Sequence, residues 1–434
     1  MVGKEHWLCG FEQSALCEEL LRFGLVKFSN QRDLPLKKGG TTDIYLNLRD
    51  ARSNPDAMRF LAKIFSSPLR ALHHVKRFIE VPEAVSCIAG VISVETNIPI
   101  ITIRDQEKEG RFTKGKMIGA YKHGERVVII DDVITDGASK ITPYRVAREN
   151  GLKVSALLVL VDREQGWEKT FREHDVNTMV WSGMTLHRLR RHLIENSIML
   201  RCDSKVEKKN PLIIALDGMP WSYVLPIVDE LRTTGTILKV NDLLFKEGFE
   251  LIRELSVYGR VMADLKLHDI PNTVANTCIA LAQYNPWAVT IHSSGSKEMM
   301  EAAVNALRTS DTKVLAVTVL TSFDEKTCEG VYGRKPWDQV KTLAQIAHEA
   351  GVHGLVCSPE EVEGLRKIYP NMLLVTPGVR SENIAHGDQA RVATPKVATE
   401  RGANYLVMGR QILRSPNPVA EVHRVLREEL RVAL

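Results

Sequence analysis

Short apolar runs follow one another at regular intervals through the second half of the chain. They are separated by amphipathic stretches such as residues 337–350, which are followed by Gly351, a common residue after a helix. The runs cover residues 212–217, 236–241, 260–269, 288–293, 313–320, 354–358, 371–378 and 403–410. Eight alternating strand and helix units in about 220 residues are typical of a TIM (β/α)8 barrel. The pattern therefore predicts such a barrel over residues 211–434.

The first half of the chain has a different pattern. Apolar, β-branched runs at residues 98–104, 125–134 and 154–163 are separated by loops and helices, and further helices are predicted at residues 12–23 and 56–64. This favours an α/β fold with an open sheet over residues 1–200, in which the early helices cover one face or form a small subdomain. Residues 201–210 are charged and lose the apolar periodicity, so we expect a linker between two domains.

Composition narrows the class of protein. The 434 residues are 44% hydrophobic and 26% charged, as in ordinary globular proteins, and no run of eighteen apolar residues predicts a membrane span. The chain starts without the basic and apolar regions of a secretory signal. Seven scattered cysteines, none in a CxxC pattern, favour a cytoplasmic location and argue against a structural zinc site. The net charge of only +5 favours phosphorylated small molecules over nucleic acid or a membrane as partners.

One predicted strand carries an unusual cluster of charges. Asp264 and Lys266 alternate along it and would share one face, while Asp269 lies just past its end. An isolated buried charge costs several kcal/mol or more, so the three groups are either paired in a site or solvated as a surface ion pair. The carboxyl ends of barrel strands carry the active site in TIM barrels, and other charged residues are expected there too. These are Asp217, Lys239, His292, Arg380 and Arg410.

Seven segments of the predicted barrel, in order along the chain, resemble orotidine 5′-phosphate decarboxylase of the bacterial type. They are LIIALD (212–217), LKV (238–240), ADLKLHDIPNT (263–273), LTS (320–322), VTPGVR (375–380), GDQ (387–389) and GR (409–410). The D-x-K-x-x-D pattern alone also occurs in related barrels that act on sugar phosphates. The resemblance implies decarboxylation without a cofactor, in which fixed charges stabilise a carbanion that no conjugated system absorbs.

The resemblance also implies roles for single residues. Asp264 would lie against the substrate carboxylate, and Lys266 would stabilise the anion and protonate C6, kept charged by two flanking carboxylates. Lys239 and Asp269 would complete an alternating charge array, with Asp269 supplied across the interface of a homodimer or higher homo-oligomer. The expected substrate-binding residues are Asp217, Thr273, Thr321, Ser322, Arg380, Gln389, Gly409 and Arg410.

Within that set, each group has an expected ligand. Gly378, Gly409 and Arg410 would bind the phosphate, with Gln389 on a lid over it. Asp217, Lys239 and Thr273 would contact or flank the ribose, and Thr321 and Ser322 would read the pyrimidine. His292 is expected to orient its neighbours. One departure is Asn241, which stands where the family usually has a glycine, and whose side chain could crowd the end of its strand.

The segment RVVIIDDVITDGASK (126–140) resembles the phosphoribosyl pyrophosphate signature of type I phosphoribosyltransferases. Adjacent acids at a strand end can hold ribose hydroxyls, and a loop of small residues at a helix start can bind a 5′-phosphate. The acids are Asp131 and Asp132, and the loop consists of Thr135, Asp136, Gly137, Ala138 and Ser139. Within the superfamily the likeness is to orotate phosphoribosyltransferase, carried by LKKG (36–39), IYLNLR (44–49) and VDREQG (161–166).

By this second resemblance, Lys37 and Arg163 would bind orotate, with Thr135 near its carboxylate. Arg104 and the catalytic Lys108 would lie on a mobile loop that reaches pyrophosphate, whose charge Mg²⁺ would help to neutralise. Four residues depart from the family pattern. Asp105 replaces a basic residue, Gly110 replaces a histidine or tyrosine, and Glu80 and Glu83 place acids at the turn that usually binds pyrophosphate.

Together the halves resemble bifunctional uridine 5′-monophosphate synthases, with the transferase first and the decarboxylase second. The function implied is pyrimidine synthesis: orotate and phosphoribosyl pyrophosphate give orotidine 5′-phosphate, which is decarboxylated to uridine 5′-monophosphate. One alternative is a decarboxylase whose N-terminal half is a non-catalytic nucleotide-binding or dimerising module. Another is a barrel that acts on a sugar phosphate through bound Mg²⁺, against which the segments 376–378 and 387–389 argue.

Overall fold

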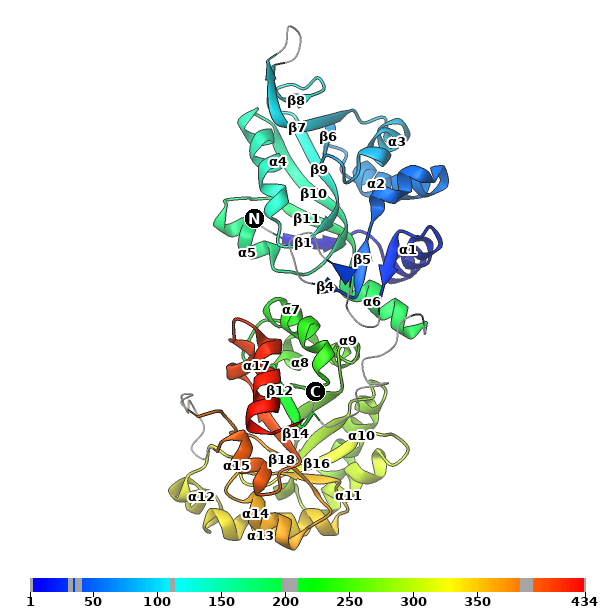
Figure 1. The fold of residues 1–434 in the computed structure, drawn as a ribbon. Coiled ribbons are helices and arrows are strands. Elements are labelled where there is room, and N and C mark those ends of the chain that lie inside the picture. Colours follow the sequence, from blue (N-terminus) through cyan, green and yellow to red (C-terminus); the bar gives the residue numbers. More distant parts are fainter. Residues whose placement is uncertain are drawn as a thin grey trace. The chain divides into compact units, whose positions relative to one another are not determined.

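The computed structural model divides the chain into two compact units, Met1–Leu200 and Arg201–Leu434 (Figure 1). The structure describes residues 3–29, 34–35, 41–109, 114–196, 198, 210–382 and 393–432. Of the predicted linker, only Asn210 lies within these ranges.

A seven-stranded mixed sheet forms the centre of the first unit, in the order β1-β11-β10-β9-β6-β7-β8. All neighbouring strands are parallel except β8, which pairs with β7 as an antiparallel hairpin. The strands are β1 (Gly3–His6), β6 (Arg77–Glu80), β7 (Ile100–Glu109), β8 (Lys114–Ile118), β9 (Arg126–Ile134), β10 (Lys153–Asp162) and β11 (Met179–Thr185). The predicted open α/β sheet is confirmed, and its arrangement is compatible with a phosphoribosyltransferase-like fold.

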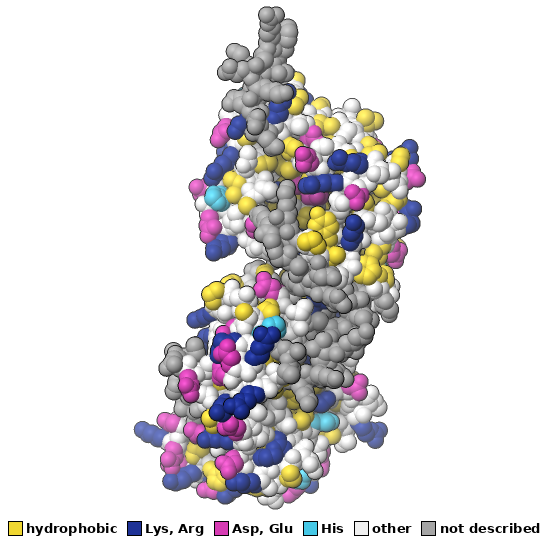
Figure 2. Space-filling view, in the orientation of Figure 1, with side chains coloured by type: hydrophobic (Ala, Val, Ile, Leu, Met, Phe, Trp, Pro, Cys, Tyr) yellow, Lys and Arg dark blue, Asp and Glu magenta, His cyan; other side chains and the backbone are white. Residues whose placement is uncertain are grey.

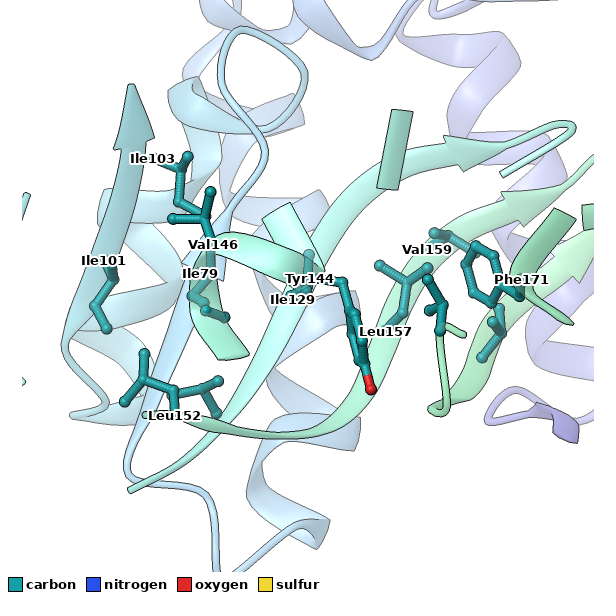
Figure 3. Packing of buried hydrophobic residues seen from close by; sticks show 14 of the residues in the cluster. Ile79, Ile101, Ile103, Ile129, Tyr144, Val146, Leu152, Leu157, Val159 and Phe171 are labelled. Carbon is teal, nitrogen blue, oxygen red and sulfur yellow. The ribbon is translucent and has the colours of Figure 1, made fainter. Parts of the chain in front are cut away.

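Helices and small sheets complete this unit. The helices are α1 (Gly10–Arg22), η1 (Leu48–Ser53), α2 (Pro55–Ala71), α3 (Ser86–Thr96), α4 (Ala138–Glu149), α5 (Trp167–Glu173) and α6 (Leu186–Glu195). Two antiparallel pairs join β2 (Val26–Phe28) to β5 (Ile44–Leu46) and β3 (Leu34–Pro35) to β4 (Thr41–Thr42). Apolar side chains of the strands pack against α4 and α5 in one core, which includes Ile129, Leu157, Val146 and Phe171 (Figure 3).

The second unit is a closed barrel of eight parallel strands. They are β12 (Leu212–Ala215), β13 (Ile237–Val240), β14 (Val261–Leu267), β15 (Ala288–His292), β16 (Lys313–Val317), β17 (Gly354–Val356), β18 (Leu373–Thr376) and β19 (Tyr405–Met408). Each predicted apolar run contains one of these strands, so the barrel prediction is confirmed. The observed strands end earlier than the runs, and several of the last residues of the runs line a cavity instead, among them Asp217, Gly378 and Arg410.

Helices alternate with the barrel strands, and short apolar side chains such as Ile213, Ile237, Met262 and Leu315 fill the barrel interior. The helices are α7 (Trp221–Leu231), η3 (Arg232–Thr234), α8 (Asp242–Glu247), α9 (Glu250–Leu255), α10 (Pro271–Ala282), η4 (Ser293–Gly295), α11 (Lys297–Ala306), α12 (Glu325–Tyr332), α13 (Pro336–Glu349), α14 (Val362–Ile368), α15 (Pro395–Glu400), α16 (Arg410–Leu413), α17 (Pro418–Arg424) and η5 (Val425–Glu429). This core rigidly supports the loops at the carboxyl ends of the strands, where TIM barrels place their sites.

Two surface properties bear on partners. Lysine, arginine and acidic side chains are intermixed over the visible face of each unit, without a continuous basic area on that face (Figure 2). Among the described residues, no helix has the length and apolar character needed to cross a lipid bilayer.

Candidate functional site

A cavity of about 970 Å³ opens among residues at the carboxyl ends of the barrel strands. Of the residues that the sequence singles out, it is lined by Asp217, Lys239, Asp264, Lys266, Thr321, Ser322, Gly378, Arg380, Gly409 and Arg410. These come from six different strand ends, so the barrel closes residues separated by almost two hundred positions around one space.

Four charged side chains that line this cavity form a linked array. Oδ2 of Asp264 lies 3.0 Å from Nζ of Lys239 and 2.8 Å from Nζ of Lys266. Lys239 also forms an ion pair with Asp217 at the end of the neighbouring strand β12. The array therefore alternates in sign from Asp217 through Lys239 and Asp264 to Lys266, as a pocket that stabilises charge requires.

The ionisation of the array is set by its neighbours. Burial raises the pKa of Asp264, but Lys239 and Lys266 outweigh that effect and hold the pKa of this carboxyl at about 2. Burial likewise lowers the pKa of Lys239, and Asp264 and Asp217 reverse the shift, so its net pKa is raised. Asp264 and Lys239 are therefore both charged near neutral pH. From the sequence we expected two carboxylates to flank Lys266. Within one chain, Lys266 contacts only Asp264 among these acids, and it is Lys239 that lies between two carboxylates, those of Asp217 and Asp264.

The backbone of β14 departs from a regular strand where the array lies. The pairing register with β15 shifts between Ala263 and Leu267, and Lys266 has a φ of 51° in the left-handed region. Such a conformation costs a side-chain-bearing residue roughly 1 kcal/mol or more and is found mainly at functional sites. The irregularity aims the Lys266 ammonium at Asp264 while its backbone N–H donates a 2.9 Å hydrogen bond to Oγ1 of Thr290.

Thr290 on β15 was not among the predicted site residues. It is fully buried, and its hydroxyl donates a hydrogen bond of 2.9 Å to Oδ1 of Asp264. The sequence signal was a single polar residue in the middle of the apolar strand AVTIH. A buried threonine hydroxyl needs a partner, and here the partner is the central carboxylate of the array.

Asn241 does not crowd the end of β13. Its backbone N–H donates to Oδ1 of Asp217 at 2.8 Å, and its side-chain Nδ2 donates to the backbone carbonyl of Asp264. Its φ of −135° is negative, so the backbone at this position does not need the left-handed conformation that favours glycine. The asparagine therefore ties β12, β13 and β14 together beneath the array, and it is not among the described residues that line the cavity.

Two predicted residues lie away from the array of their own chain. Asp269 is exposed, and its Oδ1 accepts the backbone N–H of Ile270 at 2.7 Å. Thr273 is exposed on the first turn of α10, and neither residue lines the cavity in the described part of the chain. Gln389 lies outside the described residues.

The cavity is cationic at the ends of β18 and β19. Arg380 and Arg410 line it after β18 and β19, close to Gly378 and Gly409 in sequence. Gly378 has a φ of 79°, which favours glycine, and a Cβ on Gly409 would meet the carbonyl of Ala215 at 3.3 Å. Gln411 and Arg414 also line the cavity and were missed, because neither lies in a segment with a family likeness.

His292 at the end of β15 packs against the ring of His268, with ring centroids 5.6 Å apart. Burial, followed by the charges of His268 and Lys266, lowers its pKa. The expected role of His292 in orienting its neighbours stays a prediction.

In the first unit, the predicted acids lie on β9. Asp131 is buried and forms an ion pair with Lys140, the third residue of α4, while Asp132 is partly exposed. Burial raises the pKa of Asp131 to about 7, although Lys140 opposes the shift. Only Asp132 therefore presents an accessible carboxylate, whereas the sequence suggested a pair.

The loop after β9 forms a tight turn that leads into α4. Oδ1 of Asp136 accepts the backbone N–H of Ala138 at 3.2 Å, and Gly137 has a φ of 78°. A Cβ at Gly137 would come within 2.8 Å of the Phe171 ring, so the close packing also favours glycine. Thr135 Oγ1 hydrogen-bonds to Asp136, and Ser139 is held by Lys140 at 3.0 Å.

The remaining transferase residues are distributed over other elements. Arg163 Nη2 donates to Oγ1 of Thr42 at 3.1 Å. Arg104 and Lys108 lie on strand β7, where the sequence suggested a loop, because β8 pairs with this segment. Lys37 and Gly110 lie outside the described residues, as do the side chains of Lys108 and Asp105.

Two acidic residues, Glu80 and Glu83, lie at the end of β6 and in the turn that follows it. Glu80 is only 8% exposed and accepts a hydrogen bond from the hydroxyl of Thr102 on β7, and its Oε2 is buried without a hydrogen-bond partner. Glu83 has a left-handed φ of 63°. Among the described residues, no three histidine, cysteine or acidic side chains gather as a metal site would require.

The sequence of the barrel unit is similar to known proteins. Residues 210–425 match the model of the orotidine 5′-phosphate decarboxylase / HUMPS family. An orotidine 5′-phosphate decarboxylase of Nitrosococcus oceani is 41% identical over 225 residues, which are 50% of this chain and 97% of the relative. The chain belongs to the orotidine 5′-phosphate decarboxylase / HUMPS family.

Solved structures add two likenesses for this family member. The crystal structure of orotidine 5′-phosphate decarboxylase from Lactobacillus acidophilus has 33% identity and a TM-score of 0.45, covering 51% of this chain and 99% of that one. The structure of Leishmania donovani UMP synthase has 31% identity and a TM-score of 0.38, covering 43% of this chain and 39% of that one. The assignment to the orotidine 5′-phosphate decarboxylase / HUMPS family stands on the sequence matches.

Proposed function

We propose that the barrel unit decarboxylates orotidine 5′-phosphate to uridine 5′-monophosphate in pyrimidine nucleotide synthesis. The observation that carries this is the array of Asp217, Lys239, Asp264 and Lys266 on one wall of a cavity in a member of the decarboxylase family. A substrate that carries both a carboxylate and a phosphate would match this cavity, which is lined by the array and also by Arg380 and Arg410.

The chemistry follows from the charges. The substrate carboxylate would lie against Asp264, and loss of CO2 would relieve the repulsion between the two anions. The electron pair of the broken bond would stay on C6, where the ammonium of Lys266 stabilises it and then donates a proton to it. Asp264 would hold both lysines by its Oδ2 throughout, so no cofactor takes part in the proposed steps.

Binding of the remaining groups would use the rest of the cavity. Arg380 and Arg410, with the close backbone approach allowed at Gly409, would bind the phosphate, and Gln389 would cover it. Thr321 and Ser322 line the cavity and would read the pyrimidine edge.

Assembly of two copies would complete the site. Asp269 and Thr273 are exposed at the start of α10, as is Ile270 (65%), and Ile279 in the last turns of the same helix is 58% exposed. Apolar side chains on an outer helix face favour contact with another protein surface, so a homodimer could bring Asp269 and Thr273 to the cavity of the partner. Sedimentation of the chain, with and without an Ile270→Glu substitution, tests whether this helix forms the interface.

The decarboxylase proposal is tested by following orotidine 5′-phosphate absorbance with the purified chain. We expect conversion to uridine 5′-monophosphate that persists in excess chelator. Activity abolished by chelator would instead support a metal-dependent sugar phosphate enzyme.

We further propose that the first unit is an orotate phosphoribosyltransferase. The support is the strand, acid, loop and helix arrangement of β9 and α4 with Asp132, Asp136 and Gly137, on a sheet compatible with that fold. Asp132 would hold the ribose hydroxyls, and Thr135 to Ser139 would bind the 5′-phosphate. Mg²⁺ would bind together with phosphoribosyl pyrophosphate, and its charge would help to neutralise the pyrophosphate leaving group.

A non-catalytic first unit is the competing proposal. It is favoured by the commitment of Asp131 to Lys140 and by the buried, acidic Glu80 at the turn expected to receive pyrophosphate. Orotate absorbance, followed over time with the full chain, phosphoribosyl pyrophosphate and Mg²⁺, distinguishes the two proposals. Consumption of orotate with pyrophosphate release supports the transferase, and its absence in a chain that still decarboxylates orotidine 5′-phosphate supports the competing proposal.

A further inference from the structure

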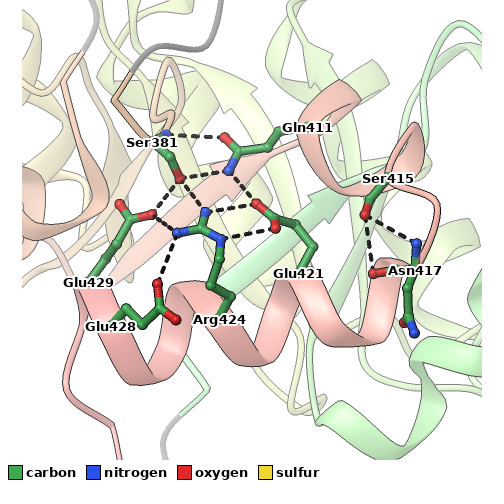
Figure 4. A network of polar contacts seen from close by, with 8 residues as sticks. All are labelled: Ser381, Gln411, Ser415, Asn417, Glu421, Arg424, Glu428 and Glu429. Carbon is green, nitrogen blue, oxygen red and sulfur yellow. Dashed lines mark hydrogen bonds and ion pairs between the residues drawn. The ribbon is translucent and has the colours of Figure 1, made fainter.

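A polar network adjoins the cationic end of the cavity (Figure 4). At its centre, Oγ of Ser381 accepts hydrogen bonds from Nε2 of Gln411 at 2.6 Å and from Nη2 of Arg424 at 2.9 Å, and it donates to Glu429. Oε1 of Gln411 also accepts the backbone N–H of Ser381 at 3.1 Å. Gln411 therefore holds both the main chain and the side chain of Ser381.

Arg424 provides the charged anchor of this network. Its Nη2 and Nε donate to the two carboxylate oxygens of Glu421 at 2.8 and 3.0 Å, and its Nη1 donates to Glu429 at 3.0 Å. Glu421 in turn accepts Nε2 of Gln411 at 2.8 Å. A bidentate arginine and carboxylate pair has a fixed geometry, so the contacts join α17 and η5 firmly to the loop after β18.

The network reaches the cavity through two sequence neighbours. Ser381 follows Arg380, and Gln411 follows Arg410, and both arginines line the cavity. On its other side, the backbone of Arg380 is fixed by a 3.0 Å hydrogen bond to the carbonyl of Ala393. Ordering a long arginine side chain costs conformational entropy, so the binding of one small anion by two arginines depends on where their backbones are held.

We propose that Arg424, acting through Ser381 and Gln411, is a positioning residue that sets Arg380 and Arg410 for the 5′-phosphate of the bound nucleotide. The inference rests on the proposed function, since it takes the ligand to be a nucleoside monophosphate. Arg424 is not among the described residues that line the cavity, so it acts on the ligand only through its neighbours.

Calorimetric binding of uridine 5′-monophosphate and of uridine to the full chain tests the proposal. Arg424→Leu is expected to raise the Kd of the nucleotide about tenfold, the scale of one good interaction, and to leave the Kd of uridine unchanged. Arg424→Lys should recover part of the loss, because it keeps the charge without the bidentate geometry. Arg253→Leu is the matched control, since Arg253 has a similar side-chain exposure of 38% against 34% and a comparable glutamate pair on α9.

Equal weakening for both ligands, or no change for either, would overturn the proposal. If Arg424→Leu does not fold, Ser381→Ala serves instead, because it removes only the central hydroxyl, and the same selective loss is expected. The proposed reaction is scored separately by CO2 release from orotidine 5′-phosphate. A wild-type chain that prefers the nucleotide but releases no CO2 overturns the reaction and leaves the binding comparison valid.

Discussion

The hydroxyl of Thr290 and the carboxylate of Asp264 are joined by a 2.9 Å hydrogen bond inside the barrel. The same hydroxyl oxygen accepts the backbone N–H of Lys266. One side chain thus fixes both the central acid of the array and the irregular backbone that carries the proposed proton donor.

Thr290→Val removes this hydroxyl at nearly constant volume. A hydrogen bond to a charged group contributes about 1.5–3 kcal/mol, so we expect kcat to fall by about tenfold or more and the free energy of unfolding to fall by about 1–2 kcal/mol. Steady-state decarboxylation and urea unfolding measure the two effects. Thr290→Ser keeps the hydroxyl and should retain most of the activity, and a valine variant as active as wild type would contradict the assigned role.

Lys266→Ala removes the proposed proton donor. We expect CO2 release to fall by at least about a thousandfold, because both electrostatic stabilisation and proton transfer are lost. Any orotate consumption by the first unit should be unchanged. Lys246→Ala, at an exposed pair with Asp242, is the control for loss of one lysine. Equal loss of both activities would show that the two units do not work independently.

The pKa of Asp264 makes a prediction for acid stability. Its folded value of about 2 lies below the unfolded value near 3.9, so the ionised group stabilises the fold above about pH 4. This contribution is lost as the pH falls through the folded value. Between pH 6 and pH 3, wild type should lose about 1 kcal/mol more unfolding free energy than Asp264→Asn. Urea unfolding at the two pH values tests this, and parallel losses in both proteins would argue against the ionised pair.

Asn241 offers a test of a residue that departs from its family. Asn241→Gly removes the hydrogen bond to the Asp264 carbonyl and adds freedom to the unfolded chain, so we expect destabilisation by about 1–2 kcal/mol. Decarboxylation should fall by less than about tenfold, since the charges remain. Asn241→Ala separates the lost hydrogen bond from the added backbone freedom. A glycine variant that is more stable than wild type would show that the side chain does crowd this strand end.

Gly137→Ala probes the loop of the first unit. The left-handed φ of 78° and the approach of the new Cβ to Phe171 predict destabilisation by about 1–3 kcal/mol, together with weaker binding of phosphoribosyl pyrophosphate. Gly90→Ala, in helix α3 with open space around the position, should be neutral or slightly stabilising. Thermal unfolding and calorimetry compare the two variants, and similar behaviour of both would rule out a special conformation at Gly137.

The sequence predicted the barrel well because each strand lies in an apolar run, and several of these runs end at a charged residue such as Asp217, Lys239 or Arg410. Proximity of Asp264 and Lys266 followed from strand alternation, although the observed backbone at Lys266 is left-handed. Helix α2 runs to Ala71, past the predicted end at residue 64, because buried Phe65 and Leu69 continue its apolar face through Pro68. Strands β1, β6, β8 and β11 were not predicted, since short strands lack a clear period.

Pairings between distant residues could not be predicted from the sequence. Lys140 lies nine positions after Asp131 and neutralises it only because the first turn of α4 lies against β9. Thr290 and Asp264 meet through strand pairing, and Ser381, Gln411 and Arg424 meet only after the last helices pack. The role of Asp269 in another subunit stays a prediction, since a sequence alone offers no way to determine an interface.

The left-handed backbone at Lys266 sets stability against catalysis. Glycine would relax this conformation at no steric cost, yet it would remove the ammonium on which the proposed protonation depends. Selection for thermal tolerance alone would therefore favour changes that silence the enzyme at this position. Screens for thermally stable variants of this chain should also measure decarboxylation, since a gain in stability from a substitution of Lys266 would come with a loss of the proposed activity.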